Sequence, residues 1–286
     1  MATSPMKKNT IVRARAARLL GVLSWVAPSS AADLASRLWF TIPSSSPAAA
    51  DVAGGVPFRV GVAGRSVRGA VWGEGPTVYL VHGWAGDSRQ MAPLVGPLVA
   101  AGHRVVAYDG PGHGRSDPGP SGPRRSNAVE FSDALAAVAD RHGPARAVVA
   151  HSMGAMATML ALRQDRLSVE RLVFVAPMPE LRSYLDRFAA GLSLGPRARH
   201  RLDAALEARV GMLVEDFELL GLAEQAGTPP LLVVHDRKDR QLAWAASAEL
   251  VDRWPDARLV TTDGLGHSRL LGDRGVHEEI VRFVRV

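Results

Sequence analysis

The chain has 286 residues, enough for one large domain, and 47% of them are hydrophobic while 22% are charged, as in ordinary folded proteins. It contains no cysteine, which excludes disulfides, a thiolate nucleophile and a cysteine-bound metal. The formal net charge is +6, but the first 40 residues contribute +5 of it, because they hold six Lys or Arg and one acid, Asp33. The rest is nearly neutral and lacks the basic stripe of a nucleic-acid site, so we expect no nucleic-acid partner.

Residues 1–42 form a basic N-terminal segment for which two interpretations stay open. Apolar residues recur there at helical spacing and predict an amphipathic helix: Val12, Ala16, Leu19, Leu23 and Val26. Basic residues followed by an apolar run and small residues up to Ala32 also fit a signal peptide. The helix interpretation predicts a cytoplasmic protein, and the signal peptide an exported one. No stretch of the chain is long and apolar enough to predict a membrane span.

The helix has two possible partners. It can dock on the protein itself, for which four large apolar side chains are available: Trp25, Leu38, Trp39 and Phe40. It can also touch an anionic membrane surface peripherally, through its arginines. A Pro-, Ser- and Ala-rich stretch at 43–57 predicts a linker to the folded body at 58–286.

The body alternates between short apolar runs and segments with helical periodicity. The runs expected as strands are 58–62, 66–72, 77–81, 104–108, 147–150, 172–175, 231–234 and 257–261. Strands that are apolar on both faces and alternate with helices predict an α/β fold with a mostly parallel sheet and helices on both faces. The stretch at about 178–228 is helical and offers no strand. We therefore expect a small helical cap inserted over the carboxyl edge of the sheet, where active sites of such folds form.

Residues 148–154, Val-Val-Ala-His-Ser-Met-Gly, predict a nucleophile at Ser152. They end one expected strand and begin a helix. A serine on such a sharp turn presents its hydroxyl above the sheet, and its neighbours must be small because the backbone is crowded. Gly154 meets that need, whereas Ala150 stands where glycine is usual. The alternative is a serine that only caps the helix.

A serine hydroxyl needs a general base, and the base needs an orienting acid. The loop after 258–261 leads through two glycines to His267, and the loop after 231–234 holds Asp236 and Asp239. The order Ser, Asp, His is the one expected for this architecture. We predict His267 as the base and leave both aspartates open as the acid, with Asp263 disfavoured because it lies so close to His267. We expect the remaining candidate histidines to lie at the surface or to serve packing: His200, His235 and His277.

Residues 81–84, Val-His-Gly-Trp, end the strand that precedes the first major helix. Backbone N–H groups there can point at a developing oxyanion. We predict the N–H groups of Trp84 and Met153 as its two donors, each contributing about 3 kcal/mol to transition-state stabilisation. His82 looks like a second catalytic histidine, but we expect it to brace this loop.

These segments resemble the α/β-hydrolase superfamily, in particular its serine esterases and lipases. The likeness runs from about residue 58 to the C-terminus and rests on HGW (82–84), DGPGHGRSD (109–117), AHSMG (150–154), HDRKD (235–239) and GLGH (264–267). It favours Asp239 over Asp236, and it assigns a turn-shaping part to 109–117.

The resemblance implies an enzyme that cleaves a carboxylic ester through an acyl-enzyme on a Ser152–Asp239–His267 triad. The substrate would be a small ester-like molecule, and neither a metal nor an organic cofactor would be needed. The same triad could serve an acyltransferase, a carbon–carbon bond hydrolase or a lyase, and the fold could also carry a non-catalytic binding protein.

Overall fold

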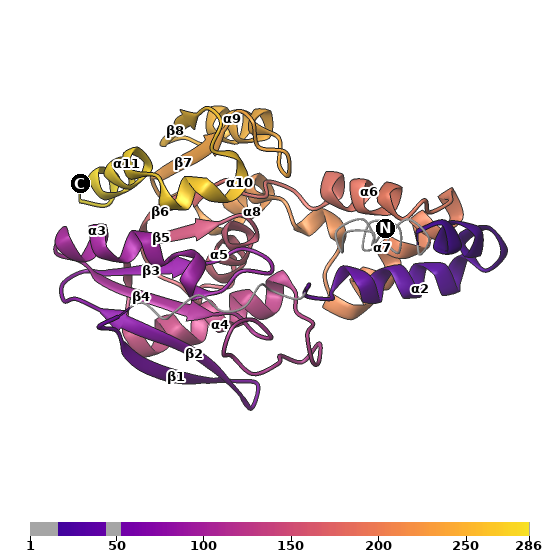
Figure 1. The fold of residues 1–286 in the computed structure, drawn as a ribbon, viewed down its shortest axis with the longest axis horizontal. Helices are drawn as coiled ribbons and strands as arrows, with labels where there is room; N and C mark the ends of the chain where they lie inside the picture. Colours follow the sequence, from indigo (N-terminus) through magenta and orange to yellow (C-terminus); the bar gives the residue numbers. More distant parts are fainter. Residues whose placement is uncertain (1–16, 44–52, 286) are drawn as a thin grey trace, which may run out of the picture. The chain divides into compact units, whose positions relative to one another are not determined.

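The computed structural model describes residues 17–43 and 53–285, which form two compact units (Figure 1). The helical unit combines the chain up to Thr41 with Glu180–Phe217, and the sheet unit combines Ile42–Pro179 with Glu218–Val286. The predicted helix positions Val12 and Ala16 lie outside the described residues, as does most of the predicted linker.

The sheet unit contains an eight-stranded sheet in the order β1-β2-β4-β3-β5-β6-β7-β8. Its strands are β1 (Val56–Val62), β2 (Arg65–Trp72), β3 (Thr77–Val81), β4 (Arg104–Asp109), β5 (Ala145–His151), β6 (Val169–Val175), β7 (Leu231–Asp236) and β8 (Ala257–Thr262). The pairs β1–β2 and β2–β4 are antiparallel and all the others are parallel. The predicted α/β fold with a mostly parallel sheet is thereby confirmed, because fully buried runs such as β3 can form only in the middle of a sheet covered on both faces.

Helices cover both faces of this sheet (Figure 1). They are α3 (Val95–Ala100), α4 (Ala128–His142), α5 (Met153–Arg163), α8 (Leu219–Ala226), α9 (Trp244–Arg253), α10 (Gly266–Arg269) and α11 (Arg274–Arg285), with short 3₁₀ turns at Ser88–Gln90, Ala92–Leu94 and Leu270–Gly272. Leu98 of α3 and Ile280 of α11 share a buried cluster with alternate strand residues such as Leu80. The intervening strand residues point to the opposite face, and α4, α5 and α8 pack beside one another there.

The helical unit is built from residues 17–26, α2 (Pro28–Trp39), α6 (Arg182–Gly191), α7 (Pro196–Val210) and a 3₁₀ turn at Val214–Asp216. Small residues of α2, Ala31 and Ala35, are fully buried in one cluster with Leu202 and Leu206 of α7. Their short side chains let the two helices approach closely. The N-terminal helices therefore dock on the inserted segment, and α8, which lies inside the predicted cap at 178–228, belongs to the sheet unit.

The side chains that dock differ in part from those expected. Phe40 is buried, and the Trp39 ring meets Phe188 edge-on with centroids 5.0 Å apart. Trp25 and Leu38 instead remain 72% and 45% exposed. The expectation was wrong for these two because smaller side chains of the same helices, such as Leu20 and Ala35, fill the cluster in their place.

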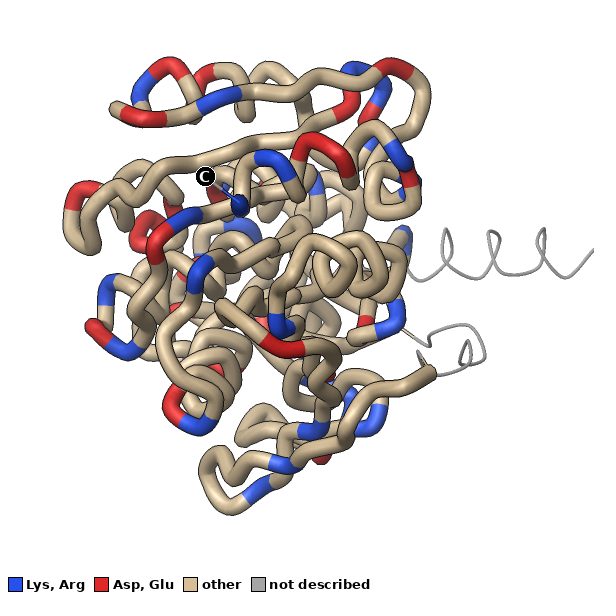
Figure 2. The backbone as a smooth tube through the Cα atoms, turned by 90° about the vertical axis from the view of Figure 1, so that its left-hand side faces the viewer, with Lys and Arg blue, Asp and Glu red and all other residues tan. Residues whose placement is uncertain are grey.

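Charge is unevenly divided between the units. The sequence of the sheet unit holds 22 Lys or Arg and 21 Asp or Glu, so the helical unit accounts for +5 of the formal net charge of +6. Figure 2 shows blue and red positions interspersed over the side of the described chain that it presents. In the described part of the chain, no helix has the length and hydropathy needed to cross a bilayer.

Candidate active site

Ser152 occupies the turn between β5 and α5 with φ 54° and ψ −119°, a region that few residues other than glycine adopt. Its backbone is fixed on both sides. The Ser152 N–H donates to the Val175 carbonyl at 3.0 Å, and its own carbonyl accepts from the Ala155 N–H at 3.1 Å. The hydroxyl makes no capping hydrogen bond to α5. The strained turn therefore holds a serine whose side chain is not used as a helix cap.

Glycines allow the neighbouring chain to approach this turn. A Cβ at Gly154 would lie 2.8 Å from the Val81 carbonyl oxygen, and one at Gly83 would lie 2.8 Å from the His151 Nδ1 and 3.0 Å from the Ser152 Cβ. Real Cβ atoms essentially never come within 3.0 Å of such an atom, so both positions favour glycine. The loop after β3 is thus packed directly against the serine turn, and Ala150 is accommodated there as a fully buried residue of β5.

Asp239 and His267 come from loops after neighbouring strands, β7 and β8, and they meet. The His267 Nδ1 lies 2.7 Å from the Asp239 Oδ2, and the Asp239 side chain is completely buried. The other carboxylate oxygen, Oδ1, accepts from the N–H groups of Gln241 at 2.7 Å and Leu242 at 3.1 Å.

Burial alone would raise the pKa of Asp239, but hydrogen bonds from His235, His267 and the loop backbone hold it below its usual value. An ionised carboxylate can only accept, so the His267 Nδ1 carries the proton and Nε2 is the nitrogen that can take one.

Asp236, the other candidate acid, is directed elsewhere. Its oxygens accept from the Thr262 hydroxyl at 2.7 Å and from the N–H groups of Leu265 at 2.8 Å and Lys238 at 2.9 Å. Burial raises the pKa of Asp236, but these hydrogen bonds outweigh it and lower the value. Asp236 therefore ties the β7 and β8 loops together, while Asp263 forms an exposed ion pair with Lys238.

His151 links the serine turn to the histidine loop, a contact that the sequence did not suggest. Its Nε2 lies 3.0 Å from the His267 carbonyl oxygen, and the two rings are 4.7 Å apart between centroids. Burial and the neighbouring His267 lower the pKa of His151 to about 3, so the ring is uncharged and Nε2 is the donor. No hydrogen bond joins the Ser152 hydroxyl to His267 within the described residues; such bonds often tighten only when substrate binds.

The loop after β3 is braced by two buried histidines. The His82 Nδ1 donates to the Gly83 carbonyl at 2.7 Å, while its Nε2 accepts from the Gly110 N–H at 2.9 Å. The His113 Nε2 accepts from the Ala85 N–H at 3.2 Å, and burial lowers the pKa of His113 to about 3. Neither ring is available as a base.

The N–H groups of Trp84 and Met153 differ from those around them. Neither donates a hydrogen bond to another described residue, although the neighbouring N–H groups of Gly83 and Ala85 both do. These two predicted donors thus lie on the two segments that Gly83 brings together, with their hydrogens unused.

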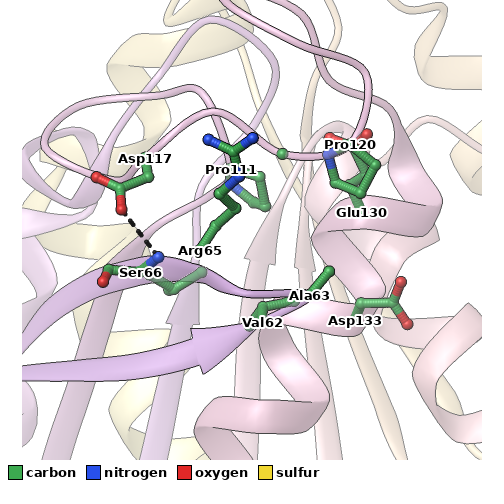
Figure 3. Close-up of a pocket in the computed structure, with 11 residues that line it drawn as sticks. Val62, Ala63, Arg65, Ser66, Pro111, Asp117, Pro120, Glu130 and Asp133 are labelled. Carbon is green, nitrogen blue, oxygen red and sulfur yellow. Dashed lines mark hydrogen bonds between the residues drawn. The ribbon is translucent and has the colours of Figure 1, made fainter.

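A hollow in another part of the sheet unit involves none of these residues (Figure 3). It lies between the β1–β2 turn, the loop after β4 and α4, and it is lined by Arg65, Asp117, Glu130 and Asp133 among others. Two of its carboxylates are already bound by the chain itself, since Asp117 accepts from the Ser66 N–H at 3.0 Å and Glu130 from the Ser121 N–H at 2.7 Å. Across the residues with described positions, no group of three or more His, Asp or Glu is arranged to hold a metal ion.

The comparison with known proteins identifies the class of protein to which this fold belongs. Residues 78–279 match the sequence profile of the Alpha/beta hydrolase family, and the chain belongs to that family. Among its curated relatives is a pimeloyl-[acyl-carrier protein] methyl ester esterase of Xanthomonas campestris pv. campestris. It is 31% identical over 255 residues, which cover 75% of this chain and 97% of the relative.

Solved structures share the fold at low sequence identity. An esterase from Exiguobacterium antarcticum has a TM-score of 0.62 at 17% identity, covering 80% of this chain and 99% of that one. An esterase from Pyrococcus furiosus has a TM-score of 0.64 at 17% identity, covering 86% and 97%.

Proposed function

We propose that the protein is a serine carboxylesterase, with Ser152 as nucleophile, His267 as general base and Asp239 as the acid that orients it. The observation that carries the proposal is the 2.7 Å contact between the His267 Nδ1 and the Asp239 Oδ2, at the same sheet edge as the strained Ser152 turn. The named ester hydrolysis of the Xanthomonas relative supports an ester as the substrate class.

In the proposed reaction, the His267 Nε2 takes the Ser152 hydroxyl proton while Oγ attacks the ester carbonyl carbon. The negative charge that forms on the carbonyl oxygen is bound by the N–H groups of Trp84 and Met153, which donate to no other residue in the described part of the chain. The intermediate expels the alcohol, which takes the proton from His267. Water then hydrolyses the acyl-enzyme by the same steps, with Asp239 stabilising the histidine cation each time.

Replacing the nucleophile tests the proposal. We expect Ser152→Ala to lower kcat for short p-nitrophenyl esters by at least about 10⁴-fold while changing the free energy of unfolding by less than about 1 kcal/mol. The wild-type protein should react with a fluorophosphonate probe and the variant should not. Wild-type turnover in Ser152→Ala would overturn the assignment, and an inert wild-type protein would indicate a binding protein of this fold.

The same assay separates hydrolysis from group transfer. Esters of straight-chain acids, methyl esters included, are offered with and without alcohol acceptors, and the products are identified. Free acid as the product in both cases supports the esterase. Transfer to the acceptor in water would make the protein an acyltransferase, and inertness towards all esters with intact probe labelling would favour a carbon–carbon bond hydrolase or lyase.

We further propose that the N-terminal helix contacts an anionic membrane surface. Four apolar side chains of this helix are between 66% and 76% exposed: Leu19, Val22, Trp25 and Val26. Arg18 is exposed beside them, and the first 40 residues carry a net charge of +5, which suits anionic lipid.

Vesicle co-sedimentation tests this contact. The wild-type chain should sediment with phosphatidylglycerol vesicles and not with phosphatidylcholine vesicles, and Val22→Ser/Trp25→Ser should abolish that binding. Leu213→Ser, which removes a 56% exposed leucine elsewhere in the helical unit, is the matched control and should bind as the wild type does. No sedimentation of the wild type, or equal binding by the double variant, would contradict the proposal.

We propose that the N-terminal segment is retained and that the protein is cytoplasmic. Cleavage after Ala32 would remove Leu20, Ala31 and Ala32 from the buried cluster of the helical unit, where each is at most 4% exposed. Peptide mapping by mass spectrometry of the protein purified from the cytosolic fraction should still find the residues before Asp33. A mature chain beginning near residue 33 would favour the signal peptide.

A further inference from the structure

His235 is a second histidine on the proposed triad acid. It lies on β7, next to its last residue, and its side chain is completely buried. The His235 Nε2 is 3.2 Å from the Asp239 Oδ2, and the His235 Nδ1 is 2.7 Å from the Ser247 hydroxyl oxygen. The same carboxylate oxygen of Asp239 therefore contacts two imidazoles, one from His235 and one from His267.

The direction of these hydrogen bonds follows from the charge of Asp239. Because its pKa is lowered, Asp239 is a carboxylate and can only accept, so the His235 Nε2 must be the donor. The other ring nitrogen, Nδ1, lies 2.7 Å from the hydroxyl oxygen of Ser247, a buried residue of α9. Ser247, His235 and Asp239 thus form one hydrogen-bonded chain.

We propose that His235 is a positioning residue that holds Asp239 in register with His267, an inference that rests on the proposed esterase function. The backbone N–H groups of Gln241 and Leu242 fix only Oδ1 of Asp239. Without His235, the single bond on Oδ2 would be the one to His267, and rotation of the carboxylate about its Cβ–Cγ bond would be opposed mainly from the Oδ1 side. His235 adds a restraint on Oδ2 itself, so that His267 presents Nε2 in one direction.

Two substitutions at His235 test the donor. His235→Leu should lower kcat for p-nitrophenyl acetate by about 10- to 100-fold and leave KM within about 2-fold, because the loss concerns the orientation of His267 and not ester binding. His235→Gln places an amide N–H near the same oxygen and should recover kcat to within about 5-fold of wild type. His103→Leu replaces a buried histidine at the amino end of β4 and should leave kcat unchanged.

A double-mutant cycle separates positioning through Asp239 from a merely structural effect. In an Asp239→Asn background, His235→Leu should change kcat by less than about 2-fold, because the carboxylate it positions is gone. The same fractional loss of kcat in both backgrounds, or no recovery in His235→Gln, would overturn the proposal.

Ser247→Ala keeps the test decisive if His235→Leu does not fold. It leaves His235 in place but removes the hydroxyl that holds the ring at Nδ1, so the ring can tilt away from Asp239 and kcat should fall about 3- to 10-fold. Wild-type kcat in a folded Ser247→Ala would overturn the proposal. Failure of the esterase assignment itself is recognised separately, by activity that survives Ser152→Ala.

Discussion

The two units of the chain differ in the kind of contact that stabilises each of them internally. At the carboxyl edge of the sheet, three buried polar side chains are each held by several hydrogen bonds: Asp239, Asp236 and His82 each have at least two partners. The helical unit instead packs Ala and Leu side chains into one cluster, and its charged groups pair at the surface, as Arg199 does with Asp186 at 2.5 Å.

The difference indicates in which unit a small substitution should change the reaction rate and in which it should change the stability of the fold. A hydrogen-bonded site loses function when one group moves by a fraction of an ångström, because each group orients the next. A cluster of small and branched apolar side chains loses free energy of unfolding when its volume changes. Its contacts are not directional, so such a change should not disturb the orientation of a reacting group.

Of the variants that compare the two aspartates of the β7 loop, Asp239→Asn should have the largest effect on activity. We expect kcat to fall by about 10³- to 10⁴-fold with little loss of stability, because the amide cannot hold His267 in the tautomer that leaves Nε2 unprotonated.

Asp236→Asn is the matched variant, three residues away and equally buried. It should destabilise the fold by about 2–4 kcal/mol, since its oxygens satisfy buried donors from two loops, while kcat of the folded protein stays within about 10-fold. Steady-state kinetics and urea unfolding of both variants check this, and the reverse pattern would make Asp236 the triad acid.

Much of this site could be predicted from the sequence, because its parts are local. The run from Val148 to Gly154 contains the end of a strand, the turn and the start of a helix. Gly83 and Gly154 mark the positions where the two segments of backbone pack closely. His151 and His235 could not be assigned in that way. Their partners lie 116 and 4 residues away, and nothing in the spacing distinguishes a histidine that packs from one that contacts a member of the proposed triad.

The helical unit shows the same limit. The amphipathic pattern predicted an N-terminal helix and left docking and membrane contact open, and it did not single out Trp25 and Leu38 as exposed. Which face of a helix is buried depends on a partner that is distant in the sequence, here α7. A local pattern with two apolar faces does not determine which of the two is buried.

A smaller loss of activity is expected from Gly83→Ala. A Cβ there would lie 2.8 Å from the His151 Nδ1 and 3.0 Å from the Ser152 Cβ, so the loop that offers the Trp84 N–H must move away. We expect kcat to fall by about 10- to 100-fold, because the displaced Trp84 N–H would lose much of its hydrogen bond to the developing oxyanion. Gly96→Ala has no atom within 4 Å of the added carbon and should leave kcat unchanged, so equal rates in both variants would contradict the role given to this loop.

The hydrogen bonds on Asp236 also predict how stability depends on pH. Its pKa is lower in the folded protein than in the unfolded chain, where it is about 3.9. The stabilisation is therefore fully present above that value and is lost as the pH falls through the folded-state pKa. The free energy of unfolding should decline more steeply below about pH 4 in the wild type than in Asp236→Asn. Asp263→Asn, at an exposed ion pair, is the control and should follow the wild type.

The smallest effect on catalysis should come from overfilling the helical unit. Ala35 is completely buried in the cluster that α2 shares with α7, so Ala35→Leu should lower the free energy of unfolding by about 1–3 kcal/mol. Because the proposed triad and oxyanion donors all belong to the sheet unit, kcat for a short soluble ester should stay within about 2-fold. Leu34→Ala, one residue earlier and 44% exposed, should change neither quantity and serves as the control. If Ala35→Leu lowered kcat as strongly as Gly83→Ala while the protein stayed folded, the helical unit would take part in the chemical step, and the contrast between the two units would fail.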